Sequence, residues 1–180
     1  KSEFNVGWAI TAAKRDLCDG CDVNHDFTKT IFDAYLEGRT LITNQADMTD
    51  ILLQMDIVLN TWEKVVAAVT IHYVNDVAAD IAGIIAAGDT TAAPGSDATA
   101  DYENHWGEMR GYANGLLYND FKVIEDANLN RIYAVMGTAP VYPTNGNFDD
   151  MQAYHDSLVG EVRAIFQASY GFSAANVANW

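Results

Sequence analysis

Apolar residues recur every three or four positions along most of the chain, which is the spacing that buries one face of an α-helix. One clear stripe begins after Asp26 and includes Phe27, Ile31 and Tyr35. Strict alternation of apolar and polar residues between paired turns, the pattern typical of β-strands, does not occur in the sequence. The pattern therefore predicts an all-α protein.

The stripes and their flanking cap residues predict helices over about 2–17, 26–38, 47–87, 99–118, 124–136 and 148–170. Gly38 either ends the second of these helices or marks a closely packed position before Leu41. The segment 47–87 has no proline and one glycine, so it forms either one long helix or two helices broken near Asn60, with Thr61 as the second N-cap. The segments 88–97 and 138–147 contain glycine and proline and predict the two longest loops.

Short polar connections between the predicted helices favour an antiparallel bundle of five to seven helices. The chain has 180 residues, of which 49% are hydrophobic, and this is enough for one well-packed core. We therefore expect a single all-helical domain over residues 1–180. Because the chain begins at Lys1 rather than at Met, we expect it to be the mature or processed region of a longer exported protein.

The sequence has 25 acidic residues against 10 Lys and Arg residues, and its formal net charge is -15 at pH 7. Such a charge repels phosphate backbones and anionic lipid surfaces, so nucleic acid is not an expected partner. It attracts a cation or a basic protein surface, although it also serves solubility. The longest apolar run is far shorter than the roughly 20 residues of a transmembrane helix, so no membrane span is expected.

Cys18 and Cys21 are the only cysteines, and their C-x-x-C spacing allows a local disulfide in an oxidising compartment. Zinc binding by this pair would need further ligands, of which His25 is one candidate. A thioredoxin-like redox role would need a βαβ unit, which the helical pattern does not offer.

The residues Asp22, Asn24 and Asp26 reproduce the D-x-N-x-D start of a calcium-binding loop. Phe27 stands where that loop needs glycine, and Asp33 stands where it needs glutamate. A calcium site is therefore one interpretation of these residues. A solvated acidic turn that caps the next helix is the other, and we favour it.

Two histidines have a carboxylate at helical spacing. His105 and Glu108 are three residues apart, and His72 and Asp76 are four apart, so each pair shares one face of a helix. If the two helices are neighbours, these side chains form a four-ligand site for a divalent metal. The alternative is that each pair is a hydrogen bond at the edge of a helix contact.

Residues 105–119 read HWGEMRGYANGLLYN and precede a short predicted helix. This region, within 102–137, resembles the imelysin-like helical proteins of bacterial periplasms and surfaces, and is similar to their uncharacterised relatives. The resemblance covers about a fifth of the chain. His105 and Glu108 match the last two residues of the G-x-H-x-x-E motif, which is thought to bind metal in imelysins, whereas Glu103 stands at the position of its glycine.

The resemblance implies a secreted, periplasmic or cell-surface helical domain. Some members of the family are linked to iron uptake, and the family was once credited with peptidase activity. We expect a binding domain associated with a divalent metal or iron. The alternative is a non-catalytic structural or assembly subunit of an extracellular surface. An enzyme is less expected, because the sequence has no G-x-S-x-G, H-E-x-x-H or phosphate-binding glycine motif.

Overall fold

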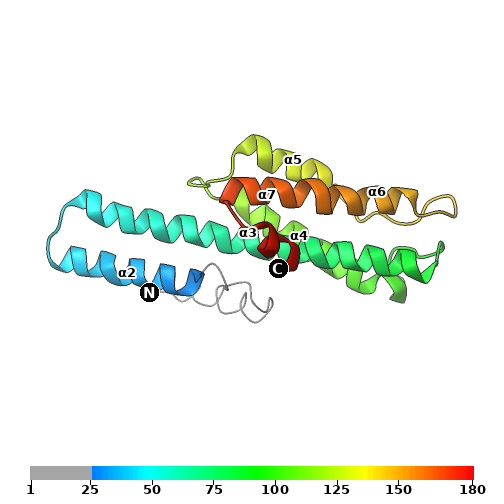
Figure 1. Cartoon of the computed structure of the whole chain (residues 1–180), viewed down its shortest axis with the longest axis horizontal. Coiled ribbons are helices and arrows are strands. Elements are labelled where there is room, and N and C mark those ends of the chain that lie inside the picture. Colours follow the sequence, from blue (N-terminus) through cyan, green and yellow to red (C-terminus); the bar gives the residue numbers. More distant parts are fainter. Residues whose placement is uncertain (1–25) are drawn as a thin grey trace.

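A computed structural model describes residues 26–180 of the protein. These residues form helices that pack together, and they contain no strand. The predicted all-α fold and its antiparallel bundle are therefore confirmed. Figure 1 shows that α2 and the first half of α3 extend beyond the other helices, which gather around the second half of α3.

Helices α2 (Phe27–Thr43) and α3 (Met48–Ala87) form a long hairpin. Of the two alternatives for Gly38, the end of a helix does not hold, because α2 continues to Thr43, and the closely packed position does. A Cβ atom on Gly38 would lie 3.4 Å from Cβ of Gln54, so this glycine stands where the two helices approach closely. It serves packing between the helices instead of ending one of them.

Helix α3 is unbroken, so the first of the two predicted alternatives holds. Thr61 is buried within the helix, with 8% of its surface exposed, and does not start a second one. The helix ends at Gly88, whose φ of 71° lies in the left-handed region that favours glycine.

Helix α3 is also the core helix of the protein, because it packs against α2, α4, α6, α7 and α8. Its length and composition would suit a membrane span. However, 61% of its most apolar window is buried inside the structure, as expected for the core helix of a globular protein.

Helix α4 (Ala100–Leu117) follows a short 3₁₀ turn at Asp97–Thr99 and runs beside α3. Glu103 stabilises the predicted loop that precedes α4. Its Oε1 accepts hydrogen bonds from Gly95 N at 2.8 Å and from Thr99 Oγ1 at 2.8 Å. The hydroxyl of Tyr142, in the second predicted loop, donates to the same oxygen at 3.0 Å. One carboxylate therefore joins both loops.

The remaining helical segments are α5 (Asp126–Met136), α6 (Asp149–Ser157), a π-helical turn at Leu158–Val162, α7 (Arg163–Tyr170) and α8 (Ala174–Asn179). Of these helices, α6, α7 and α8 pack against α3, and α5 packs against α4 and the π-helical turn. The segment from α6 through α7 is continuous, as predicted for 148–170. Helix α8 was not predicted. It docks on α3, where Asn75 Nδ2 donates to the carbonyl oxygens of Val177 and Trp180.

Candidate functional site

The two predicted histidine pairs lie on neighbouring helices. Along α3, Tyr73, Asp76 and Asp80 follow one another at spacings of three and four residues, so they share one face. Along α4, His105 and Glu108 share a face by the same rule. These two polar faces lie beside the apolar contact between the helices, where Val77 and Met109 are fully buried.

The structure gives His105 a partner that the sequence did not indicate. Its Nδ1 atom lies 2.8 Å from Oδ2 of Asp80, and both side chains are about three-quarters buried, with 29% and 23% of their surface exposed. The sequence pointed to His72 and Asp76 as the neighbours of His105 on the other helix, whereas the residue bonded to His105 in the structure is Asp80.

Charge and burial act in opposite senses on the pKa of His105. Burial lowers it, but the hydrogen bond and charge of Asp80, together with the charges of Asp76 and Glu108, outweigh burial and raise it above its ordinary value. Burial also raises the pKa of Asp80, more than the bond to His105 lowers it. The acidic surroundings therefore favour a bound proton at this pair.

Glu108 contacts other groups. Its Oε2 accepts a hydrogen bond from Asn104 Nδ2 at 3.4 Å. Burial, followed by the charge of Glu108, raises the pKa of Tyr73 to about 12. The ring of Tyr73 stacks on that of Tyr112, with centroids 5.5 Å apart. Tyr73 therefore remains a neutral phenol that fills the space between α3 and α4.

The second predicted pair is local to α3. His72 Nε2 lies 3.2 Å from Oδ2 of Asp76, one helical turn away. The ring of Tyr73 separates this pair from His105, with centroid distances of 5.0 Å to His72 and 6.1 Å to His105. The structure thus brings the four predicted ligands into one neighbourhood but divides them into separate contacts.

This division bears on metal binding. Among residues 26–180, no group of three or more His, Cys, Asp or Glu side chains is arranged to hold a metal ion. His105 with Asp80 offers one nitrogen and one carboxylate, whereas a tetrahedral zinc site uses three or four protein ligands. The four-ligand metal site stays a prediction that this arrangement does not favour.

A cavity of about 360 Å³ adjoins the pair and is lined by the carboxylates of Asp80, Asp89, Asp97 and Asp101. The last three aspartates are exposed to solvent. Within the described residues, the hydrogen bond of His105 is made with Asp80.

The predicted calcium residues are placed only in part. Asp26 caps α2, because its Oδ1 accepts a hydrogen bond from Lys29 N at 2.8 Å. This contact agrees with the capping interpretation. Asp22 and Asn24 lie outside the described residues, as do Cys18 and Cys21, so the calcium site and the disulfide stay predictions.

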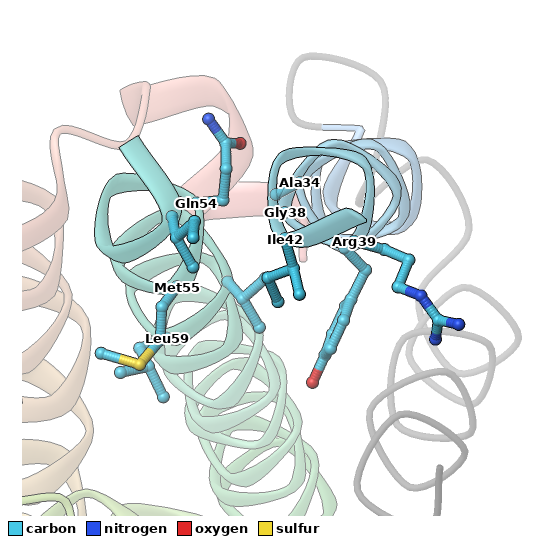
Figure 2. A pocket seen from close by; sticks show the side chains of 10 residues that line it. Ala34, Gly38, Arg39, Ile42, Gln54, Met55 and Leu59 are labelled. Atoms are coloured by element: carbon cyan, nitrogen blue, oxygen red, sulfur yellow. The ribbon is translucent and has the colours of Figure 1, made fainter. Parts of the chain in front are cut away.

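A surface feature that the sequence did not reveal is a groove between α2 and the first half of α3. Its volume is about 690 Å³. Figure 2 shows Ile42 of α2 on the same side of the hairpin as Met55 and Leu59 of α3, with Arg39 extending away from them. The groove exists because α2 buries only a narrow stripe, Ile31 and its neighbours, and leaves the flanks of both helices uncovered.

Exposed apolar side chains gather around this groove. In the part of the chain that the structure describes, all the exposed large apolar residues lie on α2, on the first half of α3 or at 117–123. They are Phe32, Leu36, Ile42, Met48, Leu52, Leu53, Met55, Leu117, Tyr118, Phe121 and Val123. Single exposed apolar residues are common on proteins, but a concentration on one part of the surface marks an interaction site.

Sequence reasoning also missed Glu63, the one buried charged residue among those described. It lies in the apolar segment that begins at Trp62, and a lone carboxylate in such a helix signals a buried polar contact. Its partners are on a loop and on α7, which no local spacing could identify.

Comparison of the chain with protein families, with curated proteins and with solved structures finds no match.

Proposed function

We propose that this chain is a non-catalytic helical binding domain that holds an amphipathic helix of another protein in the groove between α2 and α3. The observation that carries the proposal is the concentration of exposed apolar side chains on the hairpin that forms this groove. Ile42 and Met55, which line the groove, have 58% and 46% of their surface exposed, and Leu36, Met48 and Leu53, elsewhere on the two helices, have 58%, 65% and 55%. Exposing them costs free energy in water, which a partner's apolar face would recover.

The shape of the groove supports a helix as the ligand. Two packed helices leave a straight groove between them. An amphipathic helix fills such a groove with its side chains at i, i+3, i+4 and i+7. A flexible apolar side chain such as that of Met55 adapts to the shape of a bound apolar surface.

Charge identifies the kind of helix. Residues 26–60 contain six acidic residues and two basic ones, a net charge of -4. One of the two bases, Lys29, is already paired with Asp33. The other, Arg39, lines the groove, and the acidic residues lie outside the lining. Two copies of this hairpin would repel each other, whereas a partner helix with Lys or Arg beside its apolar face would be attracted.

This proposal agrees with the basic protein partner expected from the overall charge. It is closest to the second expected function, a non-catalytic structural or assembly subunit. The resemblance to imelysin-like proteins supports an extracytoplasmic location as part of the proposal. Metal association receives less support, since His72, Asp76, His105 and Glu108 form separate contacts.

The test uses the full chain and a fluorescent 16-residue peptide with leucines on one helical face and lysines on the other. We expect saturable binding by fluorescence anisotropy, and Met55→Glu should weaken it at least about tenfold by placing a charge in the groove. Ala134→Glu, on the exposed surface of α5, adds the same charge elsewhere and is the matched control.

A second peptide keeps the composition but scatters the leucines around the helix. Equal binding of both peptides, or equal affinity of the Met55→Glu and Ala134→Glu proteins, would show that only charge attracts the peptide and would refute the groove. Light scattering measures the oligomeric state in parallel. A dimer that Met55→Glu dissociates would assign the groove to a second copy.

A further inference from the structure

Resting on the proposed function, we infer that the loop at residues 118–123 forms the second half of the same binding surface. The partner is then a basic amphipathic helix of about four turns, which contacts the hairpin groove with one part and the aromatic side chains of this loop with the other. This inference requires a longer ligand than the groove alone would take.

The groove continues toward the loop. A second hollow of about 540 Å³ shares Tyr35, Val58 and Leu59 with the groove and extends to Tyr118 and Asn119. Along α3 the lining runs from Ile51 to Val66, which at 1.5 Å per residue is about 22 Å. A helix of about 15 residues has this length.

The loop itself is the most exposed apolar part of the described protein. Tyr118 and Phe121 have 86% and 69% of their surface exposed, more than any other large apolar residue described. Aromatic side chains that stand free on a surface are typical anchors of protein interfaces, because they bury much area and lose little conformational entropy on binding.

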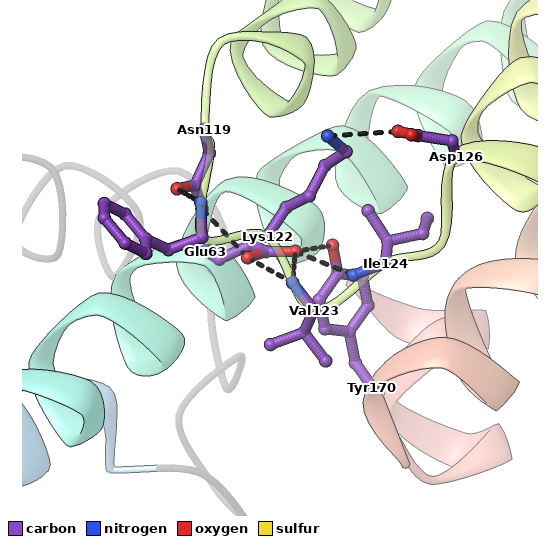
Figure 3. A network of polar contacts seen from close by, with 8 residues as sticks. Glu63, Asn119, Lys122, Val123, Ile124, Asp126 and Tyr170 are labelled. Carbon is purple, nitrogen blue, oxygen red and sulfur yellow. Dashed lines mark hydrogen bonds and ion pairs between the residues drawn. The ribbon is translucent and has the colours of Figure 1, made fainter. Parts of the chain in front are cut away.

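Glu63 holds this loop in place. Figure 3 shows its carboxylate facing the loop backbone and the hydroxyl of Tyr170. The carboxylate accepts bonds from the N–H groups of Val123 at 2.8 Å and Ile124 at 3.1 Å, from Asn119 Nδ2 at 3.0 Å, and from the Tyr170 hydroxyl at 2.7 Å. A loop fixed in this way presents its aromatic side chains without an ordering cost on binding.

The charges around the loop fit the same partner. Lys122, the one base between 111 and 130, folds back so that its Nζ lies 3.0 Å from Asp126 Oδ1, and only 20% of its side chain is exposed. Asp120 and Glu125 remain exposed. The loop therefore presents aromatic rings beside negative charge, as the hairpin presents aliphatic side chains beside negative charge.

The experiment uses the same 16-residue peptide on the full chain. A protein with Tyr118→Ser and Phe121→Ser should bind it about tenfold more weakly, although these exposed substitutions leave the melting temperature unchanged. Glu63→Gln should also weaken binding, because the loop loses its fixed position. Glu63 acts here as a positioning residue, so circular dichroism must first show that this variant folds.

The exposed double variant keeps the inference testable if Glu63→Gln does not fold. Full affinity in the double variant, with affinity lost in Met55→Glu, would overturn this inference and leave the proposed function intact. Full affinity in Met55→Glu would instead overturn the proposed function. If affinity rises when Phe4 and Trp8 are replaced by serine, the protein's own N-terminal segment competes for the surface, and the assignment to another protein is overturned.

Discussion

The imidazole of His105 and the carboxylate of Asp80 join α4 to α3, with Nδ1 and Oδ2 2.8 Å apart. Both groups have a pKa above the ordinary value. For His105, the bond and charge of Asp80 and its acidic neighbours overcome the opposing effect of burial. For Asp80, burial is the main cause. The folded protein therefore binds protons at this pair more tightly than the unfolded chain does.

This relationship predicts a pH dependence of stability. A group whose pKa is raised by folding contributes its stability fully below its unfolded pKa, about 6.5 for histidine, and loses that contribution as the pH rises through the folded pKa. Asp80→Asn should lower the free energy of unfolding by about 1 kcal/mol at pH 6 and by less at pH 9. Urea denaturation at both values measures this difference.

Asp149→Asn on α6 is the control, because it removes the same charge from an exposed position. It should have little effect at either pH. An NMR titration that places the pKa of His105 below 6.5 would contradict the argument.

The separate contacts of His72 and His105 predict weak metal binding. Zinc in modest excess should shift the melting temperature of the native protein and of His105→Ala by the same amount. A tight site would stabilise the native protein by about 2.7 kcal/mol at a ligand concentration of 100 times Kd. Stoichiometric metal in the purified protein, lost in His105→Ala, would restore the four-ligand hypothesis.

The buried hydrogen bonds of Glu63 predict that replacing this residue lowers the stability of the protein by a large amount. Glu63→Gln should lower the free energy of unfolding by about 3 kcal/mol, because the amide turns its NH₂ toward buried N–H donors and weakens bonds that a charge had strengthened. Tyr170→Phe removes one donor and should cost about 1 kcal/mol. Urea denaturation of both single variants and the double variant gives their coupling, and costs that simply add would refute the shared contact.

The hydrogen bonds of Glu103 predict a pH dependence of stability opposite to that of the His105–Asp80 pair. The N–H of Gly95, followed by the hydroxyls of Thr99 and Tyr142, lowers the pKa of Glu103. Its contribution is present above the unfolded pKa and is lost as the pH falls through the lower folded pKa. Glu103→Gln should therefore lower the melting temperature at pH 7 and have less effect near pH 3. Hydrogen exchange at Gly95 should also become faster, and unchanged exchange would exclude the bond.

The sequence by itself determined the helices, because helix formation depends on the spacing of apolar residues and on caps a few residues away. The segment predicted at 47–87 is α3, which ends before Gly88, and the segment predicted at 148–170 contains α6 and α7. The sequence left open whether α2 ends at Gly38, and it did not predict α8, which docks on α3 through Asn75.

For the candidate sites, local spacing placed His72 beside Asp76 and put His105 on one face with Glu108. It could not place Asp80 beside His105, because that contact depends on how far α3 slides along α4. Nor could it separate Met55 and Tyr118 from the core residues of similar character. Only the tertiary structure decides which apolar side chains remain uncovered, since burial depends on neighbours that are distant in the chain.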